Sequence, residues 1–209
     1  MLSVQHLAKH YRGVALFSQF QWHIERGRYW LQGANGSGKS TLLRILALLE
    51  PCEQGTLLWQ GQQVNEAWAR QHVAISADAI DFPGFLSLRT LCHYWRKQYP
   101  DALLEPLLQG FALEAVLDRE WRHASVGQRK KLSLALALSR PCPVLLLDEP
   151  ANGLDVAALA FLGNVLHSHP AIVQIMVSHQ AQPWLDAATV VQLRSDGVRQ
   201  CQSCVALAE

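Results

Sequence analysis

The sequence predicts an α/β fold with a mixed sheet core, an antiparallel β part at its N-terminus and a helical insert. Three observations predict it. Residues 19–24 alternate strictly between polar and apolar side chains, which is typical of a half-buried antiparallel strand. Residues 144–147 are a continuous apolar run, which is typical of a parallel strand buried on both faces, and the largely apolar residues 172–177 predict another buried strand. Between these two parts, apolar residues from 88 to 108 recur at helical spacing.

The composition indicates one globular domain, residues 1–209, with a helical subdomain at about 83–140 inside it. Half of the residues are hydrophobic and the formal net charge is +1, so neither a disordered chain nor a basic nucleic-acid binder is expected. No apolar run reaches the roughly 18–20 residues of a membrane span. The N-terminus lacks the pattern of a signal sequence, and we expect a chain that stays in the cytosol.

The five cysteines agree with a reducing compartment. Cys52, Cys92 and Cys142 are isolated along the chain, as buried or incidental thiols are. Cys201 and Cys204 form a C-x-x-C pair, which is half of a usual zinc site. Two incidental cysteines are the favoured interpretation, and a metal or redox role is the alternative.

The N-terminal part reads as strands joined by tight turns. Strands are expected at 2–5 and 28–32, besides the alternating strand, and the dipeptide Gln60-Gly61 predicts a hairpin between 56–59 and 62–64. A helix is expected at 41–49, with Pro51 helping to end it.

The middle and the last third contain the remaining elements. Residues 87–118 predict two or three short helices, bounded near 82–84 and 121–123. Residues 132–138 alternate like a strand, but Leu and Ala are strong helix formers and the segment is long, so a helix is expected. The other expected elements are a strand at 73–76, a helix at 155–168 and a terminal hairpin of 189–193 with 197–202.

A glycine-rich segment between the strand at 28–32 and the helix at 41–49 matches the phosphate-loop pattern G-x-x-x-x-G-K-[ST] at every required position. Glycines let successive backbone N–H groups point at phosphate oxygens. The lysine adds a positive charge for the β- and γ-phosphates, and the serine offers a hydroxyl to Mg²⁺. The expected nucleotide-binding residues here are Gly33, Asn35, Gly36, Ser37, Gly38, Lys39, Ser40 and Thr41.

An acid pair follows the buried run at 144–147. Asp148 is placed to hold Mg²⁺ directly or through water, and Glu149 to act as a general base on the attacking water. An acid pair after an apolar strand is often a solvated strand end. The phosphate loop upstream favours the functional interpretation.

At this point the chain resembles the nucleotide-binding subunits of ATP-binding cassette (ABC) transporters, over nearly its whole length. The resemblance is carried by motifs in the family's order: the phosphate loop 33–40, Ala124-Ser125-Val126-Gly127-Gln128, Asp148-Glu149, Asn152-Gly153-Leu154-Asp155 and Ser178-His179. In length and style the chain is also similar to the ATPase subunit of the haem-handling exporter in bacterial cytochrome c maturation.

The resemblance implies an ATP hydrolase that uses ATP and Mg²⁺. It implies two partners, a second ABC ATPase subunit in a homo- or heterodimer and an integral membrane transport subunit, with the chain peripheral on the cytoplasmic face of the inner membrane. Closure of the dimer on ATP would drive translocation, and hydrolysis would reset it.

The family's roles fall on particular residues. Tyr11 matches the aromatic that stacks on adenine, although an ordinary strand aromatic is the alternative. His179 matches the switch histidine at the γ-phosphate, so that Lys39, Glu149 and His179 are the implied catalytic residues. Leu154 and Asp155 match a loop along the dimer interface.

Two departures from the family pattern stand out. The family's signature, Leu-Ser-Gly-Gly-Gln, caps the nucleotide of the opposite subunit; here Ser125, Gly127 and Gln128 match it, but Val126 replaces a glycine and is expected to weaken or slow closure. Asp78 stands where the family has a glutamine near Mg²⁺, and is expected to bind the metal by charge.

Alternatives remain open on function. A soluble, non-transport ABC ATPase that acts in assembly is one, and a non-hydrolysing regulatory subunit with a degenerate signature is another; the intact catalytic residues argue against the second. Phe82, Phe85 and Trp95 are expected either to dock the membrane partner or to pack within the helical insert. Cargo and direction of transport do not follow from the sequence.

Overall fold

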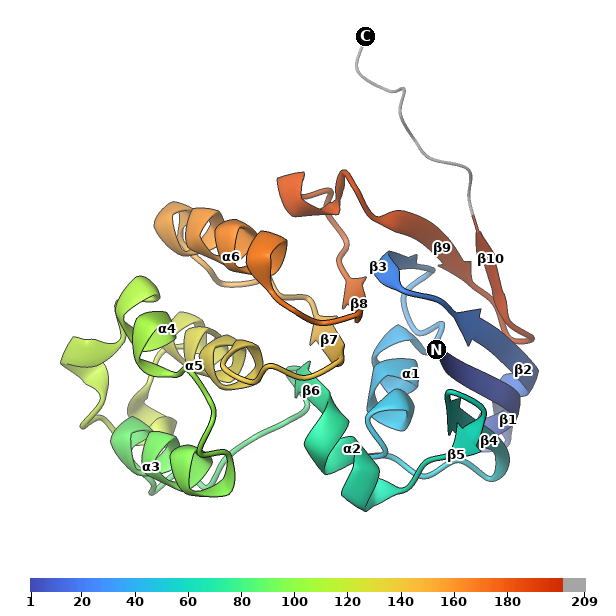
Figure 1. Cartoon of the computed structure of the whole chain (residues 1–209), viewed down its shortest axis with the longest axis horizontal. Helices are drawn as coiled ribbons and strands as arrows, with labels where there is room; N and C mark the ends of the chain where they lie inside the picture. Colours follow the sequence, from blue (N-terminus) through green and yellow to red (C-terminus); the bar gives the residue numbers. More distant parts are fainter. Residues whose placement is uncertain (201–209) are drawn as a thin grey trace, which may run out of the picture.

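The computed structural model describes residues 1–200 of the chain and consists of two sheets with helix α1 between them (Figure 1). The Cys201–Cys204 pair and the end of the expected terminal hairpin lie outside the described residues. Helices α3, α4 and α5 gather at one end of the molecule, and α6 lies across the parallel sheet from α1 (Figure 1). The mixed sheets confirm the α/β fold.

The smaller sheet is antiparallel and has the strand order β2-β1-β4-β5. Strands β1 and β2 are joined by Arg12 (φ 50°) and Gly13 (φ 81°), the two positive-φ positions of a tight hairpin turn. The strands are β1 (Leu2–Tyr11), β2 (Val14–Ile24), β4 (Gln54–Trp59) and β5 (Gln62–Gln63). The strict alternation at 19–24 buries Phe20, Trp22 and Ile24, as predicted.

The larger sheet has the order β10-β9-β3-β8-β7-β6 and is parallel except for β10. All five residues of β7 and of β8, including Gln174, are buried, which confirms both segments as central strands. The strands are β3 (Gly27–Gln32), β6 (Val73–Ser76), β7 (Val144–Asp148), β8 (Val173–Val177), β9 (Thr189–Leu193) and β10 (Val198–Gln200).

The helices follow the sequence signals with two differences. Helix α1 ends at Leu46, earlier than expected, because Leu48 adopts φ 53° and the Leu49 N–H bonds the Arg44 carbonyl, which closes a Schellman motif. Helix α2, capped by Asn65, was not expected. The helices are α1 (Lys39–Leu46), α2 (Glu66–His72), α3 (Leu88–Gln98), α4 (Glu105–Gly110), α5 (Val126–Leu138) and α6 (Val156–Ser168), with 3₁₀ turns at Glu114–Val116, Trp121–His123 and Pro183–Leu185.

Two hydrophobic cores lie on opposite faces of the parallel sheet. Val144 and Leu146 of β7 join the core that holds α1 and the antiparallel sheet. Leu145 and Leu147 point the other way, into the core formed by α3 to α6. Successive residues of one strand therefore belong to different cores, which is why β7 tolerates no polar residue before its end.

Truncating Leu145 to Ala removes a fully buried side chain (0% exposed) and leaves a cavity under α5 and α6. We expect Leu145→Ala to lower the free energy of unfolding by roughly 2–5 kcal/mol in urea titrations. The matched control is Leu103→Ala, at a leucine that is 71% exposed, with an expected change below about 0.5 kcal/mol. Equal losses for the two variants would contradict the two-core arrangement.

Candidate nucleotide-binding site

Three parallel strands bring the predicted motifs to one edge of the sheet. Val177 of β8 pairs with Leu31 of β3 on one side and with Asp148 of β7 on the other. The carboxyl ends of these strands are therefore level, and ligands of open α/β sheets bind beyond such ends. The phosphate loop follows β3, Glu149 follows β7 and His179 follows β8.

The phosphate loop is held in shape by its glycines. Gly36 (φ 77°) and Gly38 (φ 96°) adopt conformations that L side chains rarely reach. A Cβ on Gly38 would also stand 2.8 Å from the Phe17 ring, so the loop is packed tightly on β2. Lys39 begins α1, and its Nζ donates to the carbonyls of Gly33 (2.8 Å) and Ala34 (3.0 Å).

A cavity of about 370 Å³ opens over this loop. It brings together most of the residues expected to bind the nucleotide or carry out hydrolysis. Its lining consists of Tyr11, Leu16, Asn35, Gly36, Gly38, Lys39, Ser40, Thr41, Asp148, Glu149, Val177 and His179. Gly33 and Ser37 belong to the loop but lie behind this surface, and the Ser37 hydroxyl is buried without a hydrogen-bond partner.

The acid pair carries unsatisfied oxygens. Asp148 is 7% exposed, and its Oδ1 is buried without a hydrogen-bond partner, as is Oε1 of Glu149. Buried carboxylate oxygens are costly unless a donor or a cation satisfies them. The pair therefore fits a divalent cation and its water, held beside the phosphate loop.

Glu149 and His179 face each other across the ends of β7 and β8. The backbone N–H of His179 donates to Oε2 of Glu149 (3.3 Å), and the Nε2 atom of its ring lies 3.4 Å from Oε1 of Glu149. Glu149 has φ 46°, which is a strained backbone conformation for a residue with a side chain. Such a conformation persists only where the surrounding contacts hold it in place. This geometry turns the carboxylate toward the cavity.

Tyr11 closes the far side of the cavity and is 43% exposed. Its hydroxyl donates to Glu50, just after α1, and the Lys9 ammonium lies 5.1 Å from its ring centre. Burial raises the pKa of the Glu50 carboxyl, but hydrogen bonds from Tyr11 and Arg44 outweigh burial, so that this pKa lies below its ordinary value. The ring is therefore anchored by its hydroxyl, and one face remains accessible.

The signature segment lies elsewhere in the fold. Ser125 caps α5: its Oγ accepts from the Gln128 N–H (3.2 Å) and Oε1 of Gln128 accepts from the Ser125 N–H (3.0 Å). Gly127 packs against the backbone, since a Cβ there would stand 2.6 Å from the Gly153 carbonyl. None of these residues lines the nucleotide cavity of the same chain. Val126 opens α5 in helical conformation, so this position needs no positive φ.

Asp78 is likewise outside the nucleotide cavity. Its Oδ1 accepts a hydrogen bond from Lys130 Nζ (2.8 Å), and it lines a separate cavity of about 390 Å³ with Val126, Asn152 and Gly153. The structure thus places Asp78 beside Lys130 and not among the residues that line the nucleotide cavity. Lys130 itself was not anticipated from the sequence, because a lysine on a helix is usually solvated.

Among residues 1–200, no helix combines the length and the apolarity needed to cross a bilayer.

With the fold and the cavity established, comparison with known proteins identifies the class. The family model for the ABC transporter matches residues 17–152. The chain is 36% identical over 187 residues to the cytochrome c biogenesis ATP-binding export protein CcmA of Rhodospirillum rubrum, covering 86% of this chain and 79% of the relative. It is 32% identical to the protein of the same name from Nitrosococcus oceani (86% of each). It is 28% identical to the lantibiotic transport ATP-binding protein SrtF of Streptococcus pyogenes (80% and 74%).

Solved structures agree on the fold. An ATP-binding subunit of an ABC transporter superposes with a TM-score of 0.80 at 23% identity, covering 95% of this chain and 88% of that one. A dimeric bacterial ABC transporter cassette gives 0.80 at 18% identity, covering 97% and 98%. The chain belongs to the ABC transporter family and is an ABC-type ATP hydrolase.

Removing the phosphate-loop ammonium tests the cavity directly. ATP at 100 times its Kd raises the free energy of unfolding by about 2.7 kcal/mol when only the folded state binds. We expect this gain, measured as a shift of Tm, for the unaltered chain and for the control Lys97→Ala, at an exposed lysine outside the cavity. Lys39→Ala is expected to lose it. A full ATP-induced shift in Lys39→Ala would contradict the assigned site.

Proposed function

We propose that this chain is the ATPase subunit of a membrane exporter, acting as a dimer with a second ABC ATPase subunit. It would sit on the cytoplasmic face of the cell membrane beneath an integral membrane subunit. The observation that carries the proposal is the acid pair beside a complete phosphate loop, where Oδ1 of Asp148 and Oε1 of Glu149 are buried without a hydrogen bond.

The chemistry follows from the residues around the cavity. Ser40 and Asp148 would hold Mg²⁺, which neutralises charge on the β- and γ-phosphates. Lys39 would exchange its bonds to the loop carbonyls for phosphate oxygens. Glu149 would accept a proton from the attacking water, and His179, in contact with the same carboxylate, would hold that water near the γ-phosphate.

The position of the signature segment supports dimerisation. The lining of the nucleotide cavity includes none of Ser125, Gly127 and Gln128 of the same chain. The start of α5 at these residues would therefore bind the nucleotide held by a second subunit. The helix starts beside them are apolar and exposed: Val126 is 68% exposed and Val156 is 84% exposed. Exposed apolar side chains of this kind fit a subunit interface. Loss of the γ-phosphate would remove contacts on both sides at once and reopen the dimer.

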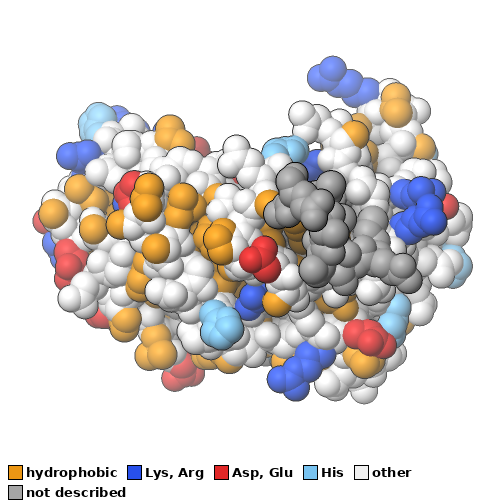
Figure 2. Space-filling view, turned by 90° about the horizontal axis from the view of Figure 1, so that it is seen from above, with side chains coloured by type: hydrophobic (Ala, Val, Ile, Leu, Met, Phe, Trp, Pro, Cys, Tyr) orange, Lys and Arg blue, Asp and Glu red, His pale blue; other side chains and the backbone are white. Residues whose placement is uncertain are grey.

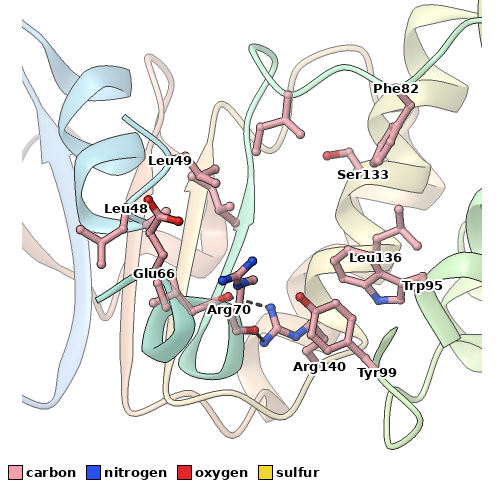
Figure 3. Close-up of a pocket in the computed structure, with 15 residues that line it drawn as sticks. Leu48, Leu49, Glu66, Arg70, Phe82, Trp95, Tyr99, Ser133, Leu136 and Arg140 are labelled. Atoms are coloured by element: carbon pink, nitrogen blue, oxygen red, sulfur yellow. Dashed lines mark hydrogen bonds between the residues drawn. The ribbon is translucent and has the colours of Figure 1, made fainter. Parts of the chain in front are cut away.

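A groove of about 300 Å³ offers a site for the membrane subunit (Figure 3). One wall is the end of α1 and α2, where Leu48, Leu49 and Glu66 lie; the opposite wall is α3 and α5, with Trp95 and Leu136 (Figure 3). The groove thus separates the nucleotide-binding core from the helical subdomain that we place at about 83–140. A helix bound in the groove would contact both the nucleotide-binding core and the helical subdomain, and would be displaced when they move relative to each other.

Of the three aromatics expected at a docking surface, two line this groove and one does not. Phe82 lines it while packing edge-on against Trp121 (5.0 Å between ring centres). Trp95 lines it while donating to the Ser139 hydroxyl (3.0 Å). Phe85 is 69% exposed and lies outside the groove. Figure 2 shows hydrophobic side chains gathered over the helical half of the upper face, with basic side chains scattered in small groups.

The relatives narrow the class of transport. Both CcmA proteins are described as export proteins of cytochrome c biogenesis, and they cover most of this chain. We therefore favour export in cytochrome c biogenesis over lantibiotic transport, to which the similarity is lower. In this proposal, recognition of the cargo is left to the membrane subunit.

Glu149→Gln tests the hydrolytic role. Removing a general base typically slows the step about 10²–10⁴-fold, so phosphate release should fall at least about 100-fold while ATP still binds. The variant should persist as an ATP-dependent dimer in size-exclusion chromatography. Lys39→Ala serves as the control that neither binds nor dimerises. Turnover close to that of the unaltered chain would contradict the assignment of Glu149.

Leu49→Glu tests the groove. Leu49 is 57% exposed on the groove wall, and a carboxylate there would have to be desolvated when an apolar helix docks. We expect Leu49→Glu to abolish co-purification of the Glu149→Gln variant with integral membrane proteins from its native cells, with ATP binding unchanged. The matched control is Leu103→Glu, 71% exposed and outside the groove. Capture of soluble proteins alone would contradict the transport function.

A further inference from the structure

Lys130 is a buried lysine that joins three separate segments. It lies in α5, and its side chain is 5% exposed. Its Nζ donates to Oδ1 of Asp78, after β6, and to the backbone carbonyl of Asp148, at the end of β7, both at 2.8 Å. A buried ammonium is costly unless it is paired and hydrogen-bonded. These two acceptors are therefore what keeps the side chain in place.

The bond to the Asp148 carbonyl acts on the peptide group that precedes Glu149. The N–H of the same peptide group donates to the Val177 carbonyl (3.0 Å). The peptide plane is thus held from both sides, by Lys130 at its oxygen and by β8 at its nitrogen. Glu149, the next residue, holds φ 46°. Such a conformation persists only where neighbouring contacts over-determine it, and the Lys130 bond is one of those contacts.

Asp78 links this clamp to the groove. The segment that follows β6 carries Asp78 on the side of the second cavity, whereas Ile80 and Phe82, two and four residues later, line the groove. The Asp78 side chain is 68% exposed, and it does not reach the nucleotide cavity. A displacement of this segment by an occupant of the groove would change the Asp78–Lys130 contact.

We propose that Asp78 and Lys130 form a positioning pair that orients Glu149 and reports the state of the groove to it, in place of a direct contact of Asp78 with Mg²⁺. This inference rests on the proposed function. The pair acts on the hydrolytic step through the peptide group of Asp148 and Glu149. Because the pair contacts neither the nucleotide cavity nor the Asp148 carboxylate, we expect it to act on kcat more than on the affinities for ATP and Mg²⁺.

The test measures kcat, the ATP Kd and the Mg²⁺ concentration of half-maximal rate for the full chain and its variants Asp78→Asn, Lys130→Met and the double variant. We expect Lys130→Met to lower kcat about tenfold, a size typical of changes along a coupling network. Asp78→Asn should lower kcat by a smaller factor. The double variant should be no slower than Lys130→Met, because the two residues act as one unit.

The ATP Kd and the Mg²⁺ half-saturation should stay within twofold in every variant, about the scatter of independent sites. Lys130→Arg, which keeps the charge and the donors, should restore most of kcat. The matched control is Asp118→Asn, in an exposed ion pair with Arg89, which should leave all three quantities unchanged.

Three results would overturn the proposal: an Mg²⁺ half-saturation raised by Asp78→Asn alone, additive losses in the double variant, or an unchanged kcat in Asp78→Asn. The third result can be obtained even if Lys130→Met fails to fold, because Asp78→Asn changes an exposed side chain. A Tm measurement would show whether Lys130→Met folds. Absence of ATP turnover in the unaltered chain would instead contradict the proposed function.

Discussion

The parallel pairing of β3, β8 and β7 is the constraint on which the rest of the structure depends. Val177 pairs with both Leu31 and Asp148, so the three strands end at the same level. Each strand end carries a different kind of group. The loop of backbone N–H donors follows β3, the pair of carboxylates lies at the end of β7, and the histidine follows β8. A shift of one residue in the pairing of β7 with β8 would turn Asp148 toward the other face of the sheet, because side chains alternate along a strand. The two hydrophobic cores make such a shift costly, since β7 supplies alternate residues to each.

A protein that couples nucleotide binding to a conformational change needs rigid parts and parts that move relative to them. The core on the α1 side joins the antiparallel sheet to the phosphate loop, and its side chains include the fully buried Phe17 and Phe20. The other core joins α3 to α6. The groove runs between the two, where α2 and β6 face α3 and α5. Polar contacts join its walls: Arg140 donates to the carbonyls of Val73 (2.7 Å) and Arg70 (2.5 Å), and the Ser76 and Ser133 hydroxyls share a hydrogen bond (2.8 Å). Polar contacts of this kind exchange partners at lower cost than a packed interface.

The two departures from the family pattern have different structural consequences. Val126 takes the first helical position of α5, where a valine is tolerated, and adds exposed apolar surface beside Ser125. Asp78 pairs with Lys130, and the buried lysine gives the aspartate a partner within the chain. The first departure thus changes an exposed surface, whereas the second lies in a contact within the chain.

Local patterns in the residues predicted most of the elements and the phosphate loop. The complete glycine-rich pattern, the alternation at 19–24 and the apolar run at 144–147 each reflect a local requirement: positive φ, one buried face, or two buried faces. Local signals also predicted a helix within α5, because the helix propensity of Leu and Ala counted for more than the alternation of apolar and small residues. The structure alone decided which residues meet across the chain. The signature segment was separated from its own chain's cavity, Asp78 was directed to Lys130, and Phe85 was kept out of the groove. These outcomes depend on how α5 packs against the ends of β6 and β7, and a contact between distant segments leaves no periodic trace in the residues that make it.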